Sequence, residues 1–253
     1  MPDREAGFFL LNVAVAVVPL PFLPWVGLPG AAAWPLLLGS VLVHLVYNLF
    51  LLRSYQLGDF GQTYPLARGT APLLVALVGV TLVGQRLGVR EVAGIVAISA
   101  GLAVLVVGRG SFRAGRPAVL AALATGMAIA TYTVLDGVGV RRSDATGAYI
   151  AWLFVLQGPL IAAVIAGRRG SVLRGSRALL FPGLLSGVVS VAAYGLVIWA
   201  QSRGRLAPVA ALRECSIVFG ALIGAVFFHE RLGPVRVLGS VIVFAGVVLL
   251  ALT

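Results

Sequence analysis

Apolar runs of about 20 residues, separated by short polar gaps, follow one another along almost the whole chain. The gaps carry Gly, Pro or Arg, as in Leu57-Gly58-Asp59 and Arg168-Arg169-Gly170. A helix crosses the hydrocarbon core with about 20 apolar residues, whereas a strand of a membrane barrel uses about 10 of alternating polarity. The runs therefore predict nine transmembrane helices, over residues 7–29, 33–54, 61–84, 89–108, 117–139, 146–167, 179–201, 206–229 and 234–252.

The composition agrees with a membrane protein. Of the 253 residues, 60% are apolar and only 11% are charged, and the mean hydropathy is +1.05. A soluble domain has about a quarter of its residues charged, so this chain lacks the polar surface that water requires. The first run follows Asp3, Arg4 and Glu5 rather than a basic segment. It is also longer than the apolar part of a signal peptide, so we expect a retained span.

The net charge of +11 comes from 19 basic residues, all of them arginine, against 8 acidic ones. Most of the arginines lie in the gaps between apolar runs, where basic residues contact lipid headgroups and set topology. We therefore expect membrane lipid as a partner, and no nucleic acid. The sequence contains no P-loop, nucleophile-elbow or zinc-protease motif, so it predicts neither an enzyme nor a cofactor or metal. Cys215 lies in an apolar run and is expected to be a core thiol.

An internal repeat relates two parts of the chain. Shifted by 145 positions, residues 68–106 align with 213–251, and 13 of these 39 positions are identical. Apolar composition inflates chance matches, but it does not bring arginines and glycines into register. The aligned pairs include Arg68 with Arg213, Gly79 with Gly224, Arg86-Leu87-Gly88 with Arg231-Leu232-Gly233, Gly94 with Gly239, and Ala100-Gly101 with Ala245-Gly246.

The repeat predicts the architecture. The three spans within 33–108 match those within 179–252, and 7–29 matches 146–167 by order, which leaves 117–139 without a counterpart. The expected fold is an all-α integral membrane protein of about nine transmembrane helices, an inverted pair of five-helix repeats with the first helix missing. The repeats would cover residues 7–108 and 117–252. Three explanations of the missing helix stay open. The start codon was placed too late, the helix was lost from the gene, or nine helices are the working number.

Each repeat carries an arginine about seven residues into one of its spans. Ionisable residues inside the hydrocarbon cost free energy and are candidates for function. Guanidinium groups bind carboxylate or phosphonate oxygens bidentately. Arg68 and Arg213 are therefore the predicted substrate-binding residues. The alternative is that both extend to the headgroups or neutralise Glu214.

Five other polar side chains within spans complete the predicted site. Glu214 and His44 are the candidates for proton coupling, with a structural counter-ion and a buried core histidine as their respective alternatives. Tyr47, Asn48 and Tyr64 are expected to bind substrate from the cavity wall, or else to hydrogen-bond neighbouring helices.

Three further features carry structural expectations. Pro65, one turn before the first of the two arginines, is expected to kink its span. Asp136, near the end of its span and close to Arg141-Arg142, is expected to form a salt bridge at the membrane interface. Gly183 and Gly187 fit close helix crossing, which in a bundle of this size favours internal packing over a dimer contact, so a homodimer stays open.

The helix ends of the repeat resemble a known family. The segments Gly84-Gln85-Arg86-Leu87-Gly88 and His229-Glu230-Arg231-Leu232-Gly233, each followed by a glycine and an Ala-Gly pair, resemble the paired EamA-type domains of the drug/metabolite transporter superfamily. The resemblance covers about residues 8–252 and implies a ten-helix inner-membrane carrier of amino acids, other metabolites or drugs, often an exporter. Residues 64–72 and 132–137 are similar to a subgroup associated with phosphonate use. In this chain Gln85 stands where the family usually has glutamate.

The residues and the resemblance together predict a secondary transporter of the cytoplasmic (inner or plasma) membrane. It would move a small anionic or zwitterionic metabolite by alternating access, with proton-coupled export as one form. Its partners would be the small-molecule substrate and membrane lipid. A lipid-linked flippase of the same fold and a non-transporting scaffold or truncated pseudocarrier are the alternatives.

Overall fold

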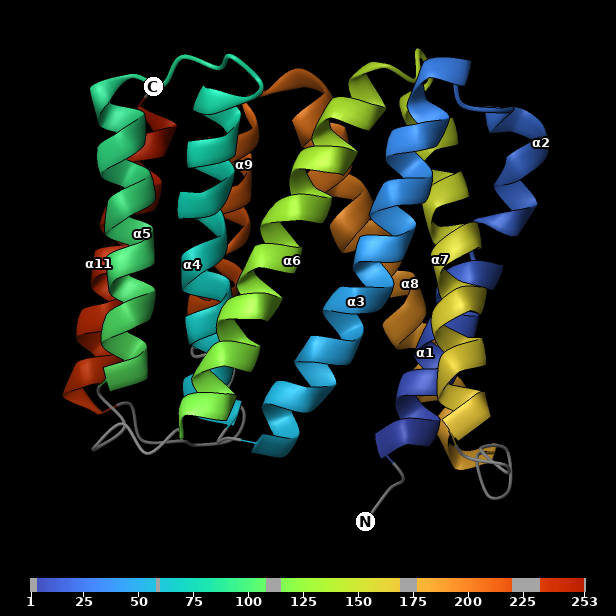
Figure 1. Ribbon diagram of the computed structural model, residues 1–253, viewed down its shortest axis with the longest axis horizontal. Coiled ribbons are helices and arrows are strands. Elements are labelled where there is room, and N and C mark those ends of the chain that lie inside the picture. Colours follow the sequence, from blue (N-terminus) through green and yellow to red (C-terminus); the bar gives the residue numbers. More distant parts are fainter. Residues whose placement is uncertain (1–3, 58–59, 108–114, 169–176, 220–232, 253) are drawn as a thin grey trace. The chain divides into compact units, whose positions relative to one another are not determined.

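The apolar runs fold into helices, and the described part of the chain contains no strand. The computed structural model (Figure 1) describes residues 4–57, 60–107, 115–168, 177–219 and 233–252. Helices are the expected solution, because in hydrocarbon each backbone N–H and C=O needs a partner within its own segment. The elements are α1 (Arg4–Val17), η1 (Leu20–Phe22), α2 (Leu23–Val26), η2 (Ala31–Ala33), α3 (Trp34–Leu57), α4 (Phe60–Thr81), α5 (Val89–Val107), α6 (Arg116–Arg141), α7 (Thr146–Arg168), α8 (Arg177–Arg203), α9 (Leu206–Arg213) and α11 (Pro234–Ala251).

Five helical segments in the described part of the chain are long and apolar enough to cross a membrane. They are Ala6–Val26, Ala31–Arg53, Arg116–Arg141, Thr146–Gly167 and Leu179–Arg203, and shorter apolar helices cover Leu66–Thr81 and Val237–Ala251. These segments coincide with predicted spans.

The first predicted span is helical only in parts. Helix α1 ends at Val17, and a 3-10 turn and the four-residue α2 follow. Pro19, Pro21 and Pro24 lie in this stretch. Proline has no backbone N–H and its ring clashes with the preceding turn, so three of them in six residues break the regular helix.

The chain divides into two compact units that do not coincide with the two predicted repeats. The first unit comprises Met1–Leu45 and Leu135–Arg203, and the second comprises Val46–Val134 and Gly204–Thr253. Each unit therefore takes segments from both predicted repeats.

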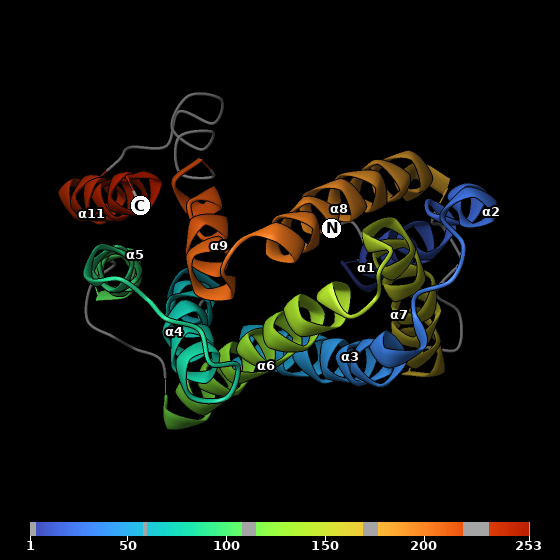
Figure 2. The same cartoon turned by 90° about the horizontal axis from the view of Figure 1, so that it is seen from above.

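In the first unit, α1 packs against α7 and α8 through small residues (Figure 2). A Cβ added at Gly187 would lie 2.4 Å from the Cβ of Ala14, and one added at Gly183 would lie 2.8 Å from the Cβ of Leu10. The two glycines thus mark internal packing, which confirms that expectation. The same unit contains a core of completely or almost completely buried side chains: Ala33, Leu37, Val41, Val140, Tyr149, Leu153 and Ile198.

In the second unit, α5 and α11 lie side by side along their length (Figures 1 and 2). A Cβ added at Gly101 would lie 2.8 Å from the carbonyl oxygen of Gly239, and one added at Gly246 would lie 2.8 Å from that of Gly94. The helices therefore run antiparallel, with backbone against backbone at both crossings. Glycine is required there because any side chain would separate the helices.

The ends of α5 and α9 are joined by polar contacts. The Glu91 carboxylate accepts a hydrogen bond of 2.7 Å from the backbone N–H of Gly88 and forms an ion pair with Arg205. Gln85 Oε1 accepts a bond of 3.2 Å from the backbone N–H of Leu206, the first residue of α9. The first N–H groups of a helix have no partner inside it, so Gln85 here satisfies one of them.

We expect Gly101→Ala and Gly246→Ala each to lower the free energy of unfolding by about 1–3 kcal/mol, because the added methyl group overpacks the α5–α11 contact. Gly167→Ala is the control, since a Cβ there meets nothing within 4 Å. Thermal unfolding of the purified chain in detergent measures all three. Unchanged unfolding temperatures in both α5–α11 variants would contradict the close contact.

Candidate functional site

Two arginines and one glutamate meet where α9 ends, in the second unit. Nη1 of Arg68 lies 3.2 Å from Oε2 and 3.3 Å from Oε1 of Glu214, and Nε of Arg213 lies 3.9 Å from Oε1. The Glu214 side chain is only 2% exposed, and those of the arginines 16% and 14%. A buried charge costs several kcal/mol unless it is paired. Glu214 is therefore the counter-ion of both arginines, and most closely of Arg68.

The backbone turns irregularly at this point. Helix α9 stops at Arg213, and the next two N–H groups donate to carbonyls three residues back, Glu214 to Ala211 (3.0 Å) and Cys215 to Leu212 (3.1 Å). Residues 216–219 are helical again. Hydrogen bonds of this spacing tighten a helix. The prediction of an unbroken helix over 206–229 is therefore wrong at residues 214–215.

The equivalent span in the first repeat lacks such a break. Helix α4 is helical throughout Phe60–Thr81, including Pro65, where a kink was expected. The departure from regular helix thus occurs in the other copy, beside Arg213 rather than beside Arg68.

Tyrosines extend the cluster. Nη2 of Arg213 donates a 2.8 Å hydrogen bond to the hydroxyl oxygen of Tyr132 on α6, and its guanidinium carbon lies 5.7 Å from the centre of that ring. The Tyr132 ring packs edge-on against Tyr47 of α3 at 5.5 Å. The structure thus places Tyr47 beside the tyrosine that Arg213 contacts, and its predicted role in substrate binding stays a prediction. Tyr132 was not among the predicted site residues, and the signal for it was its place in the family-like segment 132–137.

The other predicted site residues are Asn48, Tyr64 and His44. Asn48 is half-buried on α3, one residue after Tyr47, and successive side chains on a helix project in different directions. Tyr64 lies on α4, but its side chain is outside the described part of the chain. His44 belongs to the first unit. Cys215 is half-buried, so it is less enclosed than a core thiol.

Asp136 lies in the first unit and differs from its prediction. Its side chain is 0% exposed, with Tyr149 donating to Oδ1 at 3.0 Å and Tyr194 donating to Oδ2 at 2.6 Å. Arg141 donates instead to the backbone carbonyl of Gln201 at 2.9 Å. The expected interfacial salt bridge is therefore wrong, because the Asp136 side chain turns into the unit rather than toward its polar edge.

His44 lies close to this aspartate network. Its Nδ1 is 3.0 Å from the carbonyl oxygen and 3.2 Å from the hydroxyl of Ser40, one turn earlier on α3. The imidazole ring packs edge-on against Tyr194 at 5.6 Å. The side chain is 6% exposed, so His44 is a buried histidine with hydrogen-bonding partners.

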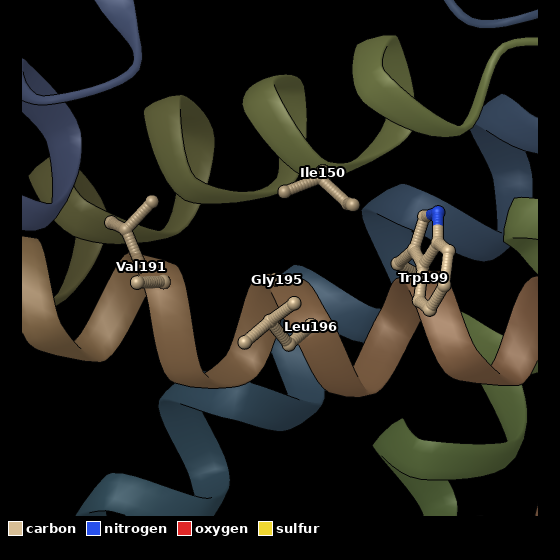
Figure 3. Close-up of a pocket in the computed structure, with 6 residues that line it drawn as sticks. Ile150, Val191, Gly195, Leu196 and Trp199 are labelled. Atoms are coloured by element: carbon tan, nitrogen blue, oxygen red, sulfur yellow. The ribbon is translucent and has the colours of Figure 1, made fainter.

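An apolar groove of about 490 Å³ lies on α7 and α8 of the first unit (Figure 3). Ile150 projects from α7 toward α8, where Gly195 leaves space for it (Figure 3). The lining contains almost no polar surface, so the groove fits a hydrocarbon chain and not an anion. It consists of Ile150, Val191, Ala192, Gly195, Leu196 and Trp199. Among the described residues, no group of His, Cys, Asp and Glu side chains could hold a metal ion.

Comparison with known proteins identifies the family. Residues 116–252, more than half of the chain, match the EamA-like transporter family. The chain belongs to this family. A search of curated proteins finds no match for the EamA-like chain.

The fold of this EamA-like transporter occurs among solved structures. One crystal structure, described only as that of a protein, matches it with a TM-score of 0.78 and 21% identity, over 99% of this chain and 90% of the other. Similarity at that level of identity shows the fold alone. Family membership makes the chain a multi-pass membrane protein of a transporter family. Its polar clusters are therefore candidates for solute or ion binding.

A double-mutant cycle of Arg68→Gln and Glu214→Gln measures the buried pair. Each single variant leaves one charge buried without its partner, whereas the double variant removes both. We expect a coupling energy of about 1–3 kcal/mol in the free energy of unfolding, measured in detergent.

The matched control is the Arg205→Gln and Glu91→Gln cycle, an ion pair in the same unit whose arginine side chain is 54% exposed. Exposed pairs contribute little, so we expect less than about 1 kcal/mol there. Additive single effects at Arg68 and Glu214 would show that the two charges do not stabilise each other.

Proposed function

We propose that this chain is a secondary transporter that moves a small anionic or zwitterionic metabolite across the cytoplasmic membrane by alternating access. Arg68 and Arg213 bind the acidic group of the substrate, with Tyr47, Tyr64 and Asn48 as further substrate-binding residues. Transport is coupled to protons in the direction of export, through Glu214 or His44. The proposal rests on family membership and on one observation, the meeting of two arginines at a single carboxylate.

The charges of the cluster favour an anionic substrate. Two guanidinium groups and one carboxylate sum to a formal charge of +1, which one acidic group of a substrate would neutralise. Glu214 holds Arg68 at 3.2 Å but Arg213 only at 3.9 Å, so Arg213 is the side chain less firmly held by the carboxylate. Its planar donors match carboxylate and phosphonate oxygens. A cationic solute would raise the charge of the site and is disfavoured.

The contact between α5 and α11 supports the proposed inverted repeat. The repeat pairs Gly94 with Gly239 and Gly101 with Gly246, and in the structure Gly94 faces Gly246 while Gly101 faces Gly239. In a contact with two-fold symmetry, residue i of one copy meets residue j of the other copy, and residue j of the first meets residue i of the second. The two glycine pairs follow this pattern. Because the helices are antiparallel, this pseudo-two-fold axis is perpendicular to them. That is the arrangement of inverted repeats in transporters.

The apolar groove favours a second candidate, the lipid-linked flippase. A flippase must bind a long hydrocarbon chain, and the groove on α7 and α8 is open and almost wholly apolar. Its lining carries no group for a charged headgroup. For this reason the carrier of a small acid remains our first proposal. We further propose a second copy of this chain, in a homodimer, as a partner.

Ligand-induced stabilisation tests the proposal. Purified chain in detergent is heated with 2-aminoethylphosphonate, succinate, alanine or the cation ethidium. A ligand at ten times its Kd stabilises the folded state by about 1.4 kcal/mol, which raises the unfolding temperature by a few degrees. We expect such a shift with one of the acidic solutes and none with ethidium.

Arg213→Gln is the decisive variant, because Glu214 keeps Arg68 as its partner when Arg213 is lost. We expect at least about tenfold weaker binding of the acid, with the exposed Arg86→Gln unchanged as the matched control. Stabilisation by a long-chain phospholipid alone would favour the flippase. An acid shift that survives Arg213→Gln would remove Arg213 from the binding site.

A further inference from the structure

The Asp136 carboxylate accepts hydrogen bonds from hydroxyl groups of two helices. Tyr149 of α7 and Tyr194 of α8 donate to its two oxygens. The side chain is 0% exposed, and the neighbouring His44 interacts with it electrostatically. Hydroxyl groups can stabilise either the ionised or the protonated carboxyl, since a hydroxyl both donates and accepts.

The packing around Asp136 holds these hydroxyl groups in place. A Cβ at Gly139, one turn after Asp136, would lie 2.6 Å from the Tyr149 hydroxyl, so the glycine makes room for that tyrosine. The rings of Phe154 and His44 pack edge-on against the Tyr194 ring, with their ring centres 6.3 Å and 5.6 Å from its centre. The oxygens of both tyrosines are thereby fixed on the carboxylate.

The contacts of His44 determine where its proton lies. The carbonyl oxygen of Ser40 is only an acceptor, so Nδ1, 3.0 Å away, carries the hydrogen in the neutral ring. Nε2 is then the nitrogen that accepts a proton. The Ser40 hydroxyl lies 3.2 Å from Nδ1. The imidazole ring packs against Tyr194, which donates to Asp136, so His44 is a titratable neighbour of the carboxylate.

We propose that Asp136 is a proton-binding carboxylate of the carrier and that the charge on the neighbouring His44 sets the pH at which Asp136 binds its proton. The proton adds to a carboxylate oxygen and gives a carboxylic acid, and both tyrosines keep their protons. Release on the other side of the membrane restores the carboxylate.

This inference rests on the proposed transport function for its role in coupling, but the binding of the proton does not require a known substrate. The carboxylate is inaccessible to water in this structure, so alternating access would have to open its path. Among the residues that the structure describes, the titratable groups facing it are His44, Tyr149 and Tyr194. Arg141, on the same helix, contacts α8 through the Gln201 carbonyl.

Infrared difference spectroscopy tests the proton site. Spectra of the full chain in lipid are compared between neutral and acidic buffer, with no solute added. We expect a reversible C=O stretching band from a buried carboxyl that becomes protonated, resolved from the bands of water-exposed carboxyls. Asp136→Asn should abolish it, and Glu214→Gln, which removes the other described carboxyl with almost no exposure, should leave it unchanged.

Two further variants keep the test decisive where Asp136→Asn fails to fold. Tyr194→Phe retains the carboxyl and removes one hydrogen bond, so the band should remain at a different frequency. His44→Gln should move the midpoint pH of the band by about one unit, with His229→Gln, the other histidine of the chain, as the control. A band that persists in Asp136→Asn, or that neither variant changes, overturns the inference. The proposed transport function is tested separately, by solute binding in Arg213→Gln. Either proposal can therefore fail without the other.

Discussion

In a lipid environment, helices gain little from burying apolar side chains against one another, because the lipid tails are equally apolar. Close backbone packing and hydrogen bonds between helices must therefore hold such a chain together. Both appear in each unit of this protein. Gly183 and Gly187 let α8 approach α1 in the first unit, and glycine pairs let α5 approach α11 in the second. Buried carboxylates are held by partners on other helices, as Glu214 is by Arg68 and Asp136 by Tyr149.

The same constraint explains which parts of the fold could be predicted from the sequence. The length of an apolar run is set by bilayer thickness, so the spans followed from counting residues. The repeat followed from glycines and arginines in register, and the contact of Gly94 with Gly246 and of Gly101 with Gly239 gives that register a physical reason. Closely packed positions tolerate no side chain, so glycine persists in both copies.

The irregular features could not be predicted in this way. Pro65 suggested a kink in the helix that holds Arg68, and α4 is continuous through that residue. The interruption of a helix occurs instead at Glu214 and Cys215, where no proline stands. Its cause is tertiary, because the turn accompanies an ion pair with a residue 146 positions away. Asp136 was misplaced for a similar reason. Its nearness to two arginines in sequence suggested a salt bridge, but the decisive partners, Tyr149 and Tyr194, are on other helices.

Glu214 and Asp136, two of the buried carboxylates, differ in a way that bears on what each can do. Glu214 is held by guanidinium groups, which stay charged at any physiological pH, so it belongs to a cluster with a lasting excess of positive charge. Asp136 is held by hydroxyl groups, which can stabilise either of its forms, with a histidine as its titratable neighbour. These contacts are the reason why we propose substrate binding at the arginine cluster of the second unit and proton exchange at the tyrosine-bonded carboxylate of the first.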